Sequence, residues 1–465
     1  MAALPPNHFL ALPRPDVHFT PAVGTPDTST LAAHDFDVDT RTGFMPPQPP
    51  LARLPAEWES WEATLDDGLA SKLQLSDRAD VSAEDRAKTE RWRSHVRNLP
   101  IISIAGLKSS ELLLRRAHHV LAWVMHLFVH TTPQSETTIN IPPPITVPLL
   151  QVSAQLQLPP VLTYSDDVLY NWAYKTPPEN PFLTAPALDN LRCLTLFTGT
   201  RDEEEFYLTS ARIELRGVEA LSIMRSIMDE AFVGDTIALR RITTYLGALA
   251  GVIAELSQIL GTLRQGCDPH IFYNDIRPWF KGADSDTRGR KWVFEGIERD
   301  PTLEQPAELS GPSAGQSTLV HALDIFLGVD RYSHSLFSTH GAARSTATLG
   351  AASGTPAVPF LTRMQSYMPR HHRTFLRHLA GSPRPLRALV ENAGNAPLRA
   401  AYDGAVKALK EFRDEHVRIV ALYILVPSKR EGKEGGPKGT GGTDAFQFVK
   451  GVRDQTAGAL LGEGR

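Results

Sequence analysis

A histidine and an arginine near the C-terminal end of the sequence are of the types that bind a metal ion and an anion. His416 lies on a stripe of apolar residues that recur at alternating spacings of four and three from Leu398 to Tyr423, which is the pattern of one buried helix face. Arg413, three residues earlier, falls on nearly the same face, and a buried-facing cation needs an anion to balance it. The stripe is compatible with a metal-binding imidazole, although a histidine on such a face is more often a core residue held by hydrogen bonds.

A GxSxG motif gives a second candidate, a nucleophilic serine. In α/β-hydrolases this motif places the serine, here Ser313, on a sharp turn that follows a β-strand. His321, His340 and Asp324 are available as its partners. Because the residues before the motif are polar and contain proline, they do not predict the required strand, and a serine hydrolase is the weaker interpretation.

Two histidine clusters give a third candidate, a zinc site. One lies along an expected helix near residues 108–129, and the other lies within residues 367–379. The histidines concerned are His119, His126 and His130 in the first cluster and His371, His372 and His378 in the second. Neither cluster shows the HExxH pattern, and His372 cannot share the face of His371 and His378. Packing or surface roles are therefore favoured for these histidines.

Helices must position these side chains, because apolar residues recur mostly with a period near 3.6. The pattern predicts helices over residues 58–75, 83–97, 108–129, 204–229, 235–264, 270–282, 316–328 and 397–426. Asp235 suits a helix cap and Pro397 a first helical turn, and Pro427 is expected to end the last helix. Alternating strand patterns are almost absent, so the sequence predicts an all-α fold.

A proline-rich segment suggests where the chain divides. Residues 139–148 contain four prolines, which predict a break without helix. We therefore place a small N-terminal helical domain at residues 1–150 and a large C-terminal helical bundle at residues 151–465. Residues 331–359 and 428–443 are rich in small residues and are expected to be mobile loops.

The composition excludes several classes of protein. The 465-residue chain is 42% hydrophobic and 22% charged with a formal net charge of -4, and it lacks the basic surplus of nucleic-acid-binding proteins. We expect no signal peptide, and the longest apolar stretch, 117–129, is too short and too polar to span a bilayer. Cys193 and Cys267 are too few for a disulfide framework, so free thiols and a cytoplasmic location are expected.

Several ordered strings closely resemble the indoleamine 2,3-dioxygenase family. They are GPSAGQST at 311–318, YMPRHHRTFLRHL at 367–379, LRAAYDGAVKALKEFRDEHVRIVALYILVP at 398–427 and KGTGGTD at 438–444. Fainter similarity extends upstream through LPPVLTYSDDVLYNW at 158–172, DEEEFYLTSARIEL at 202–215 and FYNDIRPWFKG at 272–282. The resemblance thus covers nearly all of the second domain.

The resemblance implies a small N-terminal helical domain and a large helical domain that binds haem b. The histidine of the family's long-helix motif falls on His416, which is therefore expected to be the proximal ligand of the haem iron. The arginine of that motif falls on Arg413, and the acidic residue expected to pair with it falls on Asp324. These three residues form the expected cofactor site.

The resemblance also implies a distal substrate pocket. Its residues fall on Tyr164, Phe206, Tyr207, Ser210, Phe272, Tyr273, Arg277, Ser313, Ala314 and Thr440. Ser210, Phe272 and Arg277 are the expected catalytic positions. The planar guanidinium of Arg277 suits the substrate carboxylate, and Thr440, on the glycine-rich loop, is expected to contact the amino acid portion of the substrate.

The implied reaction inserts O2 across the indole C2–C3 bond of L-tryptophan, or of another indoleamine, to give N-formylkynurenine. This is the first step of the kynurenine pathway toward NAD, and a reductant must keep the iron ferrous. Ser210 stands where the related tryptophan 2,3-dioxygenases carry a distal histidine, and a pocket without such an acid/base group argues against a peroxidase. A monomer without nucleic-acid or membrane partners is expected.

The main alternative implied by the same resemblance is a haem-binding protein that keeps the fold with little or no catalysis. Relative to the family, the insertion at residues 331–359 is long and could alter access to the pocket. The sequence leaves these two interpretations open.

Overall fold

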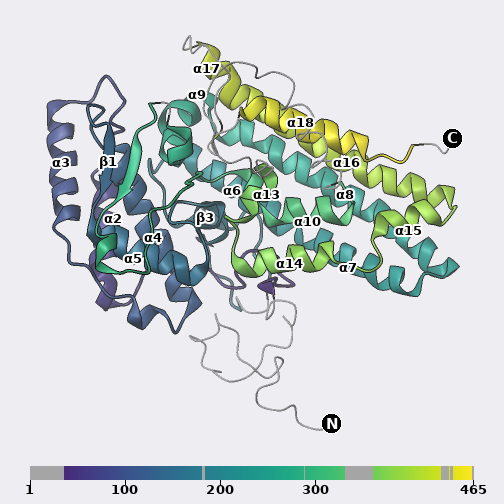
Figure 1. The fold of residues 1–465 in the computed structure, drawn as a ribbon. Helices are drawn as coiled ribbons and strands as arrows, with labels where there is room; N and C mark the ends of the chain where they lie inside the picture. The colour runs from purple at the N-terminus through teal and green to yellow at the C-terminus, as the bar shows by residue number, and fades with distance from the viewer. Residues whose placement is uncertain are drawn as a thin grey trace, which may run out of the picture.

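The computed structural model of this chain describes residues 36–180, 184–286, 288–329, 360–430, 439 and 444–462. Helices form most of this described part, and strands occur there only in two short two-stranded sheets. In one sheet β1 (Thr138–Ile141) pairs in parallel with β4 (Lys291–Phe294); in the other β2 (Trp172–Tyr174) pairs antiparallel with β3 (Leu191–Cys193). The predicted all-α fold is confirmed (Figure 1).

The first group of helices gathers at one end of the molecule (Figure 1). It consists of α2 (Glu59–Ala70), α3 (Ala83–Arg97), α4 (Glu111–His130) and α5 (Pro143–Leu156), with short 3-10 turns at Ala56–Trp58 and Ala105–Leu107. Helix α3 has the predicted bounds because Ser82 caps it, its hydroxyl accepting from the backbone N–H of Asp85 at 3.0 Å.

Helix α5 corrects the prediction that residues 139–148 contain no helix. Pro143 and Pro144 lie in its first turn, where a backbone N–H has no partner within the helix, and only Pro148 lies inside it. A division between residues 150 and 151 would fall within α5, and the two-domain boundary itself stays a prediction.

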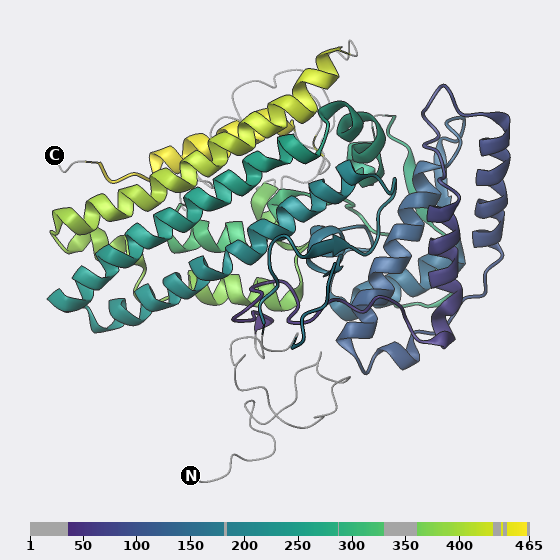
Figure 2. The same ribbon diagram turned by 180° about the vertical axis from the view of Figure 1, so that it is seen from behind.

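The second group of helices forms the bundle that fills the other end of the molecule (Figure 2). In chain order its larger helices are α6 (Arg201–Arg216), α7 (Val218–Val233), α8 (Thr236–Gly266), α10 (Thr318–Phe326), α14 (Arg370–Ala380), α15 (Leu386–Asn392), α16 (Ala396–Val420) and α18 (Ala445–Gly458). Shorter helices are α9 (Pro269–Ile271), α13 (Phe360–Gln365) and α17 (Val426–Arg430), with 3-10 turns at Arg277–Phe280, Ala283–Ser285, Ile297–Arg299 and Ala314–Gln316.

Local contacts explain one helix start that was predicted and one helix break that was not. Asp235 caps α8 as expected, its carboxylate accepting from the N–H groups of Ile237 and Ala238. The single helix predicted over 204–229 is instead broken at Gly217, where a Cβ atom would lie 2.2 Å from Leu319 of α10. The close approach of α10 therefore requires glycine between α6 and α7.

Helix α8 is the long central element of the bundle. By length and composition alone it is apolar enough to cross a membrane. In this structure it packs against α6, α7 and α16 and contributes residues such as Ile242, Leu249 and Ile253 to the core. It serves here as a core helix.

Helix α16 begins as predicted but does not end at Pro427. Asn395 caps it, accepting from the N–H of Leu398 at 3.1 Å, and Pro397 lies in the first turn. A π-helical turn (Ala421–Leu425) follows, in which the N–H of Val426 bonds back to Ala421, and α17 then includes Pro427. The prediction of a helix stop is wrong because the wider π turn changes the hydrogen-bond register just where the proline lacks a donor.

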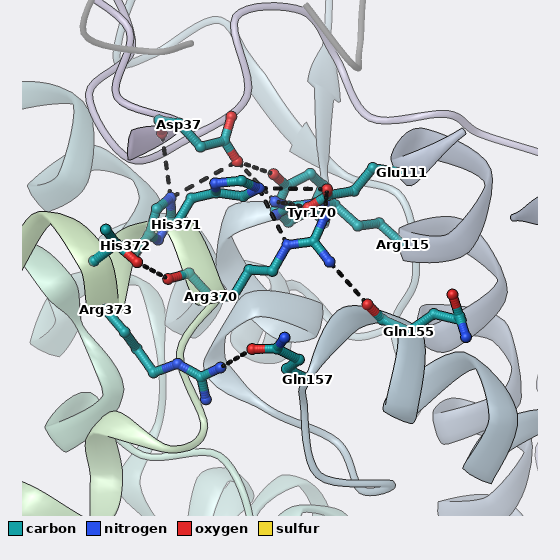
Figure 3. A network of polar contacts seen from close by, with 11 residues as sticks. Asp37, Glu111, Arg115, Gln155, Gln157, Tyr170, Arg370, His371, His372 and Arg373 are labelled. Atoms are coloured by element: carbon teal, nitrogen blue, oxygen red, sulfur yellow. Dashed lines mark hydrogen bonds and ion pairs between the residues drawn. The ribbon is translucent and has the colours of Figure 1, made fainter. Parts of the chain in front are cut away.

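A buried polar network ties α14 to the first group of helices. Figure 3 shows Glu111 of α4 between two cations, Arg115 on its own helix and Arg370 of α14, with N–O distances of 2.7 and 2.6 Å. Arg115 also pairs with Asp37 at 2.7 Å, and Asp37 accepts from the hydroxyl of Tyr170 at 3.3 Å. These ion pairs and hydrogen bonds thus link the first described residues of the chain to the network that joins the two groups of helices.

A close backbone crossing positions the loop that carries the GxSxG motif. A Cβ atom on Gly311 would lie 1.9 Å from the carbonyl oxygen of Phe280, and one on Gly282 would lie 2.1 Å from that of Leu309. The side chain of Ser310 donates to Asp284 at 2.7 Å across the same crossing. Gly311, the first glycine of the motif, and Gly282 therefore allow two backbone segments to meet.

We predict that Gly311→Ala destabilises the protein, because the added methyl group would overlap a backbone oxygen that cannot move independently. The expected loss is about 1–3 kcal/mol, measured as a shift of the urea unfolding midpoint. Gly251→Ala is the matched control, since Gly251 is exposed within α8 and a Cβ there would meet nothing within 4 Å. It should be neutral or stabilising by up to about 1 kcal/mol. Equal effects of the two substitutions would contradict the crossing as the reason for Gly311.

Candidate active site

A cavity lies among α6, α8, α10, α16 and α18, and it holds most of the residues singled out from the sequence. It has a volume of about 270 Å³. Its wall is mainly apolar.

Three π-helical segments of the described chain each contribute to the cavity wall. They are Ser165–Leu169, Phe272–Ile276 and Ala421–Leu425. Asp167, Phe272 and Tyr423 are their respective lining residues, with Val168 and Ile424 beside the first and last. A π turn is wider than an α turn and is frequent at functional sites, so the irregular backbone coincides with the cavity.

His416 of α16 lines the cavity and is partly exposed to it. Burial, and secondarily the charge of Arg413, lower the pKa of its imidazole from 6.5 to about 4. The ring is therefore neutral near pH 7, which is the form that binds metal ions. None of the residues described in the structure forms a hydrogen bond with it, so both ring nitrogens keep their bonding capacity.

Arg413 and Asp324 form the ion pair expected between them. One terminal nitrogen of the guanidinium donates to both carboxylate oxygens at 2.5 Å, and the other donates to the hydroxyl of Thr456 on α18. Both charged residues are buried and both line the cavity. The anion that balances Arg413 is thus a protein carboxylate.

Aromatic rings form another part of the wall. Phe206 lies 4.6 Å from Phe272 and 5.7 Å from Phe280, centroid to centroid, and Tyr207 lies 5.6 Å from Phe280. Ser210, one turn along α6 from Phe206, also lines the cavity. The predicted residues of this helix therefore come together on one face, joined by Phe280, which the sequence analysis did not name.

A buried carboxyl lies behind the lining residue Tyr164. Oε1 of Glu214 accepts from the hydroxyls of Tyr164 at 2.9 Å and Ser317 at 2.7 Å. Burial raises the pKa of Glu214 from 4.5 to about 7, although the two hydroxyl hydrogen bonds oppose this. Tyr164 is also held through its N–H, which donates to the side chain of Gln316 at 2.8 Å. The orientation of Tyr164 is thus fixed at both ends.

Arg277 and Tyr273 differ in their placement. Arg277 is buried, lines the cavity, and has its pKa lowered by burial, against an opposing effect of Tyr273. Tyr273 does not line the cavity; its ring centroid lies 5.6 Å from the guanidinium carbon of Arg277. Its predicted contact with the substrate stays a prediction.

The glycine-rich loop is represented by a single described residue. Gly439 lines the cavity, and its carbonyl accepts from the hydroxyl of Ser285 at 2.9 Å. Thr440 and the insertion at 331–359 lie outside the described residues, so their predicted roles stay predictions.

Ser313 and Ala314 line the cavity as expected, but Ser313 does not have the surroundings of a hydrolase nucleophile. Its hydroxyl accepts from the N–H of Gly315 at 3.2 Å at the start of a 3-10 turn, and residues 301–312 form no strand. His321 also lines the cavity, with its ring nitrogens bonded to the carbonyl of Gly315 and the side chain of Gln365. The strand on which a nucleophile elbow depends is missing from this described segment.

The clustered histidines are structural. His119, His126 and His130 bond to Thr195 and to the carbonyls of Trp279 and Lys281 at 2.8, 2.8 and 3.0 Å. His371 and His372 approach Glu111 and Asp37 in the network of Figure 3, and the ring of His378 contacts Phe36. No group of three or more metal-binding side chains occurs among the residues described here, and the contacts of these histidines are those of packing residues.

Comparison with known proteins agrees with this geometry. The family model described as indoleamine 2,3-dioxygenase matches residues 32–459. The chain belongs to the indoleamine 2,3-dioxygenase family. It is 30% identical over 435 residues to indoleamine 2,3-dioxygenase acdA of Aspergillus candidus, covering 92% of this chain and 98% of that protein. It is 29% identical to indoleamine 2,3-dioxygenase 1 of Mus musculus, covering 92% and 95%, and 29% identical to a Fusarium equiseti protein named 6-hydroxytryptophan 2,3-dioxygenase fscD, covering 93% and 99%.

Several residues in or next to the cavity of this family member were missed by sequence reasoning. Phe360 and Phe448, from α13 and α18, meet at 4.5 Å between ring centroids on its wall. Asp167 and Glu214 are acidic residues that would ordinarily be assigned to the surface. The helical spacing of Glu214 from Ser210 was the one signal available in the sequence.

We predict that Glu214 makes the stability of this family member depend on pH. Its raised pKa means that between pH 4.5 and about 7 the folded chain holds a proton that the unfolded chain has lost. This contribution is fully present below pH 4.5 and is lost as the pH rises to about 7. The loss is at most about 3 kcal/mol.

The measurement is the urea unfolding midpoint of the haem-free protein across this pH range, for wild type and Glu214→Gln. The variant should lose the downward slope, because glutamine has no proton to release. Glu411→Gln, at an exposed position of α16, should keep it. A slope that is the same in all three proteins would show that Glu214 does not titrate in this range.

Proposed function

We propose that this chain is a haem-dependent dioxygenase that converts L-tryptophan and O2 to N-formylkynurenine. The observation that carries the proposal is one cavity that combines a neutral, unbonded imidazole, an aromatic wall and a buried arginine. Family membership supports the same reaction class. The proposed location is the cytosol, which suits two buried free cysteines.

The residues of the cavity fit a haem group. His416 offers a neutral imidazole, and the apolar wall around it, with Leu263, Phe412 and Ile419 among its members, suits a porphyrin. Arg413 is held in place by Asp324, lines the same cavity and acts electrostatically on this imidazole, so it could interact with an acidic edge of the haem. When bound, ferrous haem would supply the binding and reduction of O2.

The remaining residues would hold the substrate. The rings of Phe206, Phe272 and Phe280 offer faces and edges for a flat indole, while the guanidinium of Arg277 offers a charge-assisted contact to the substrate carboxylate. Burial strengthens that contact because little water competes for it. The substrate would then lie with its ring against the aromatic wall.

The proposed reaction requires little proton transfer from acid/base groups of the protein. Both oxygen atoms of O2 enter the product, and the overall conversion neither takes up nor releases a proton. The carboxyl of Glu214 is turned to Tyr164 and Ser317, and Ser210 carries only a hydroxyl. The cavity therefore supports positioning of the substrate more than proton transfer to it.

The proposal is tested by incubating haem-loaded protein with L-tryptophan, a reductant and isotopically labelled O2. N-formylkynurenine carrying two labelled oxygen atoms is the expected product. Haem binding without product would favour the non-catalytic alternative. Labelling of Ser313 by a fluorophosphonate would revive the hydrolase alternative.

We predict that Arg277→Ala raises the KM for L-tryptophan by about 10- to 100-fold with unchanged haem content, because a charge-assisted contact contributes roughly 1.5–3 kcal/mol. Arg277→Lys should restore part of the loss, since an ammonium group keeps the charge but lacks the planar fork. Tryptamine, which lacks the carboxylate, is the control substrate. If its turnover suffers as much as that of L-tryptophan, Arg277 does not anchor the carboxylate.

A further inference from the structure

Asp167 is a buried carboxyl in the cavity wall that the proposed function does not use. It is 3% exposed and it lines the cavity. Its Oδ1 is buried without a hydrogen-bond partner, and neither oxygen is bonded by any residue described in the structure. A buried polar group in this condition is costly unless a ligand or water completes it.

The neighbouring aspartate shows that the fold can satisfy such a group. Asp166 accepts from the ring of His118 at 2.8 Å, and from the N–H and hydroxyl of Thr163 at 2.9 and 2.7 Å. Asp167, one residue later on the same π-helical segment, lines the cavity and its Oδ1 has no such partner. The two side chains thus differ in their hydrogen-bond partners rather than in degree of burial.

The surroundings of Asp167 favour the neutral form of its carboxyl. Burial raises its pKa well above the ordinary value, and the negative charges of Asp166 and Glu203 act in the same direction. A neutral carboxyl both donates and accepts hydrogen bonds. It therefore suits a partner that does the same, such as a hydroxyl group, better than it suits a cation.

The position of Asp167 relates it to the aromatic part of the cavity. An ionised Asp167 would raise the pKa of Tyr207, whose ring packs against Phe206 and Phe280, so the carboxyl lies near these rings. Asp167 and Arg277 are thus two separate polar groups in a wall that is mainly apolar.

We propose that Asp167 is a specificity-determining residue that hydrogen-bonds a hydroxyl group on the indole ring of the substrate, so that a ring-hydroxylated tryptophan is used in preference to tryptophan. The inference rests on the proposed function and narrows its substrate class. A site built to bond a hydroxyl discriminates strongly against an analogue without it, because the site's own polar group is then left unpaired.

The test compares kcat/KM for L-tryptophan with those for its 4-, 5-, 6- and 7-hydroxy derivatives, using haem-loaded protein. Wild type should prefer at least one hydroxylated isomer by about 10-fold or more. Asp167→Leu, similar in size but without polar atoms, should reduce that ratio to near one. Asp167→Asn, which keeps a donor and an acceptor, should retain part of it.

Val168→Ala is the matched control, because Val168 lines the same wall next to Asp167 but offers no hydrogen bond. It should change the rates with all five substrates while leaving their ratios alone. A wild-type protein that uses no hydroxylated isomer better than tryptophan, or a leucine variant that keeps the wild-type ratio, would overturn the inference.

Equilibrium binding separates this inference from the proposed function. Dissociation constants of the same amino acids, measured by dialysis, should show the same preference and its loss in Asp167→Leu. Infrared difference spectra should show the band of a protonated carboxyl shifting when the preferred isomer binds, and no such shift in Asp167→Asn. Selective binding without cleavage of any substrate would contradict only the proposed dioxygenase activity. Cleavage of tryptophan without selectivity would contradict only the proposed role of Asp167.

Discussion

The buried ion pair between Arg413 and Asp324 is the interaction on which the rest of the cavity depends. Helix α16 packs mainly on α8 and α18, and α10 packs mainly on α14, so the guanidinium joins elements that are otherwise held by different neighbours. Thr456 brings α18 to the same point. Removing one partner of a buried ion pair leaves an uncompensated charge and costs about 3–5 kcal/mol of folding free energy. This contact therefore constrains the relative positions of α10, α16 and α18, which form part of the cavity wall.

Irregular backbone gives that cavity its lining. Regular helices packed at ordinary distances would fill the space with their own side chains, whereas the π turns at Ser165–Leu169, Phe272–Ile276 and Ala421–Leu425 displace residues around the wall. The close crossing at Gly282 and Gly311 then brings the loop of Ser313 to the same space. Binding residues from distant parts of the sequence thus meet because regular structure is interrupted at several points.

The sequence patterns predicted the features that depend on helical periodicity. The apolar stripe places His416 and Arg413 on one face, whereas Asp324 as the partner of Arg413 came from the family resemblance and not from the pattern. Pro427 and the prolines of α5 were misread because the effect of a proline depends on whether its missing N–H had a partner, which a π turn or a helix start changes. Asp167 and Tyr273 could not be placed, since the direction of a side chain on a π turn does not follow α-helical spacing.

The central claim is that the imidazole of His416 binds the haem iron in this cavity, and replacing the ring chemically tests it most directly. His416→Gly would be purified, supplied with haem, and titrated with free imidazole while its absorption and ferrous resonance Raman spectra are recorded. The account predicts weak haem binding without imidazole, and restoration of a histidine-type iron–nitrogen signal as imidazole fills the space. A variant that shows the wild-type signal before any imidazole is added would contradict the assignment and remove the basis for the proposed reaction.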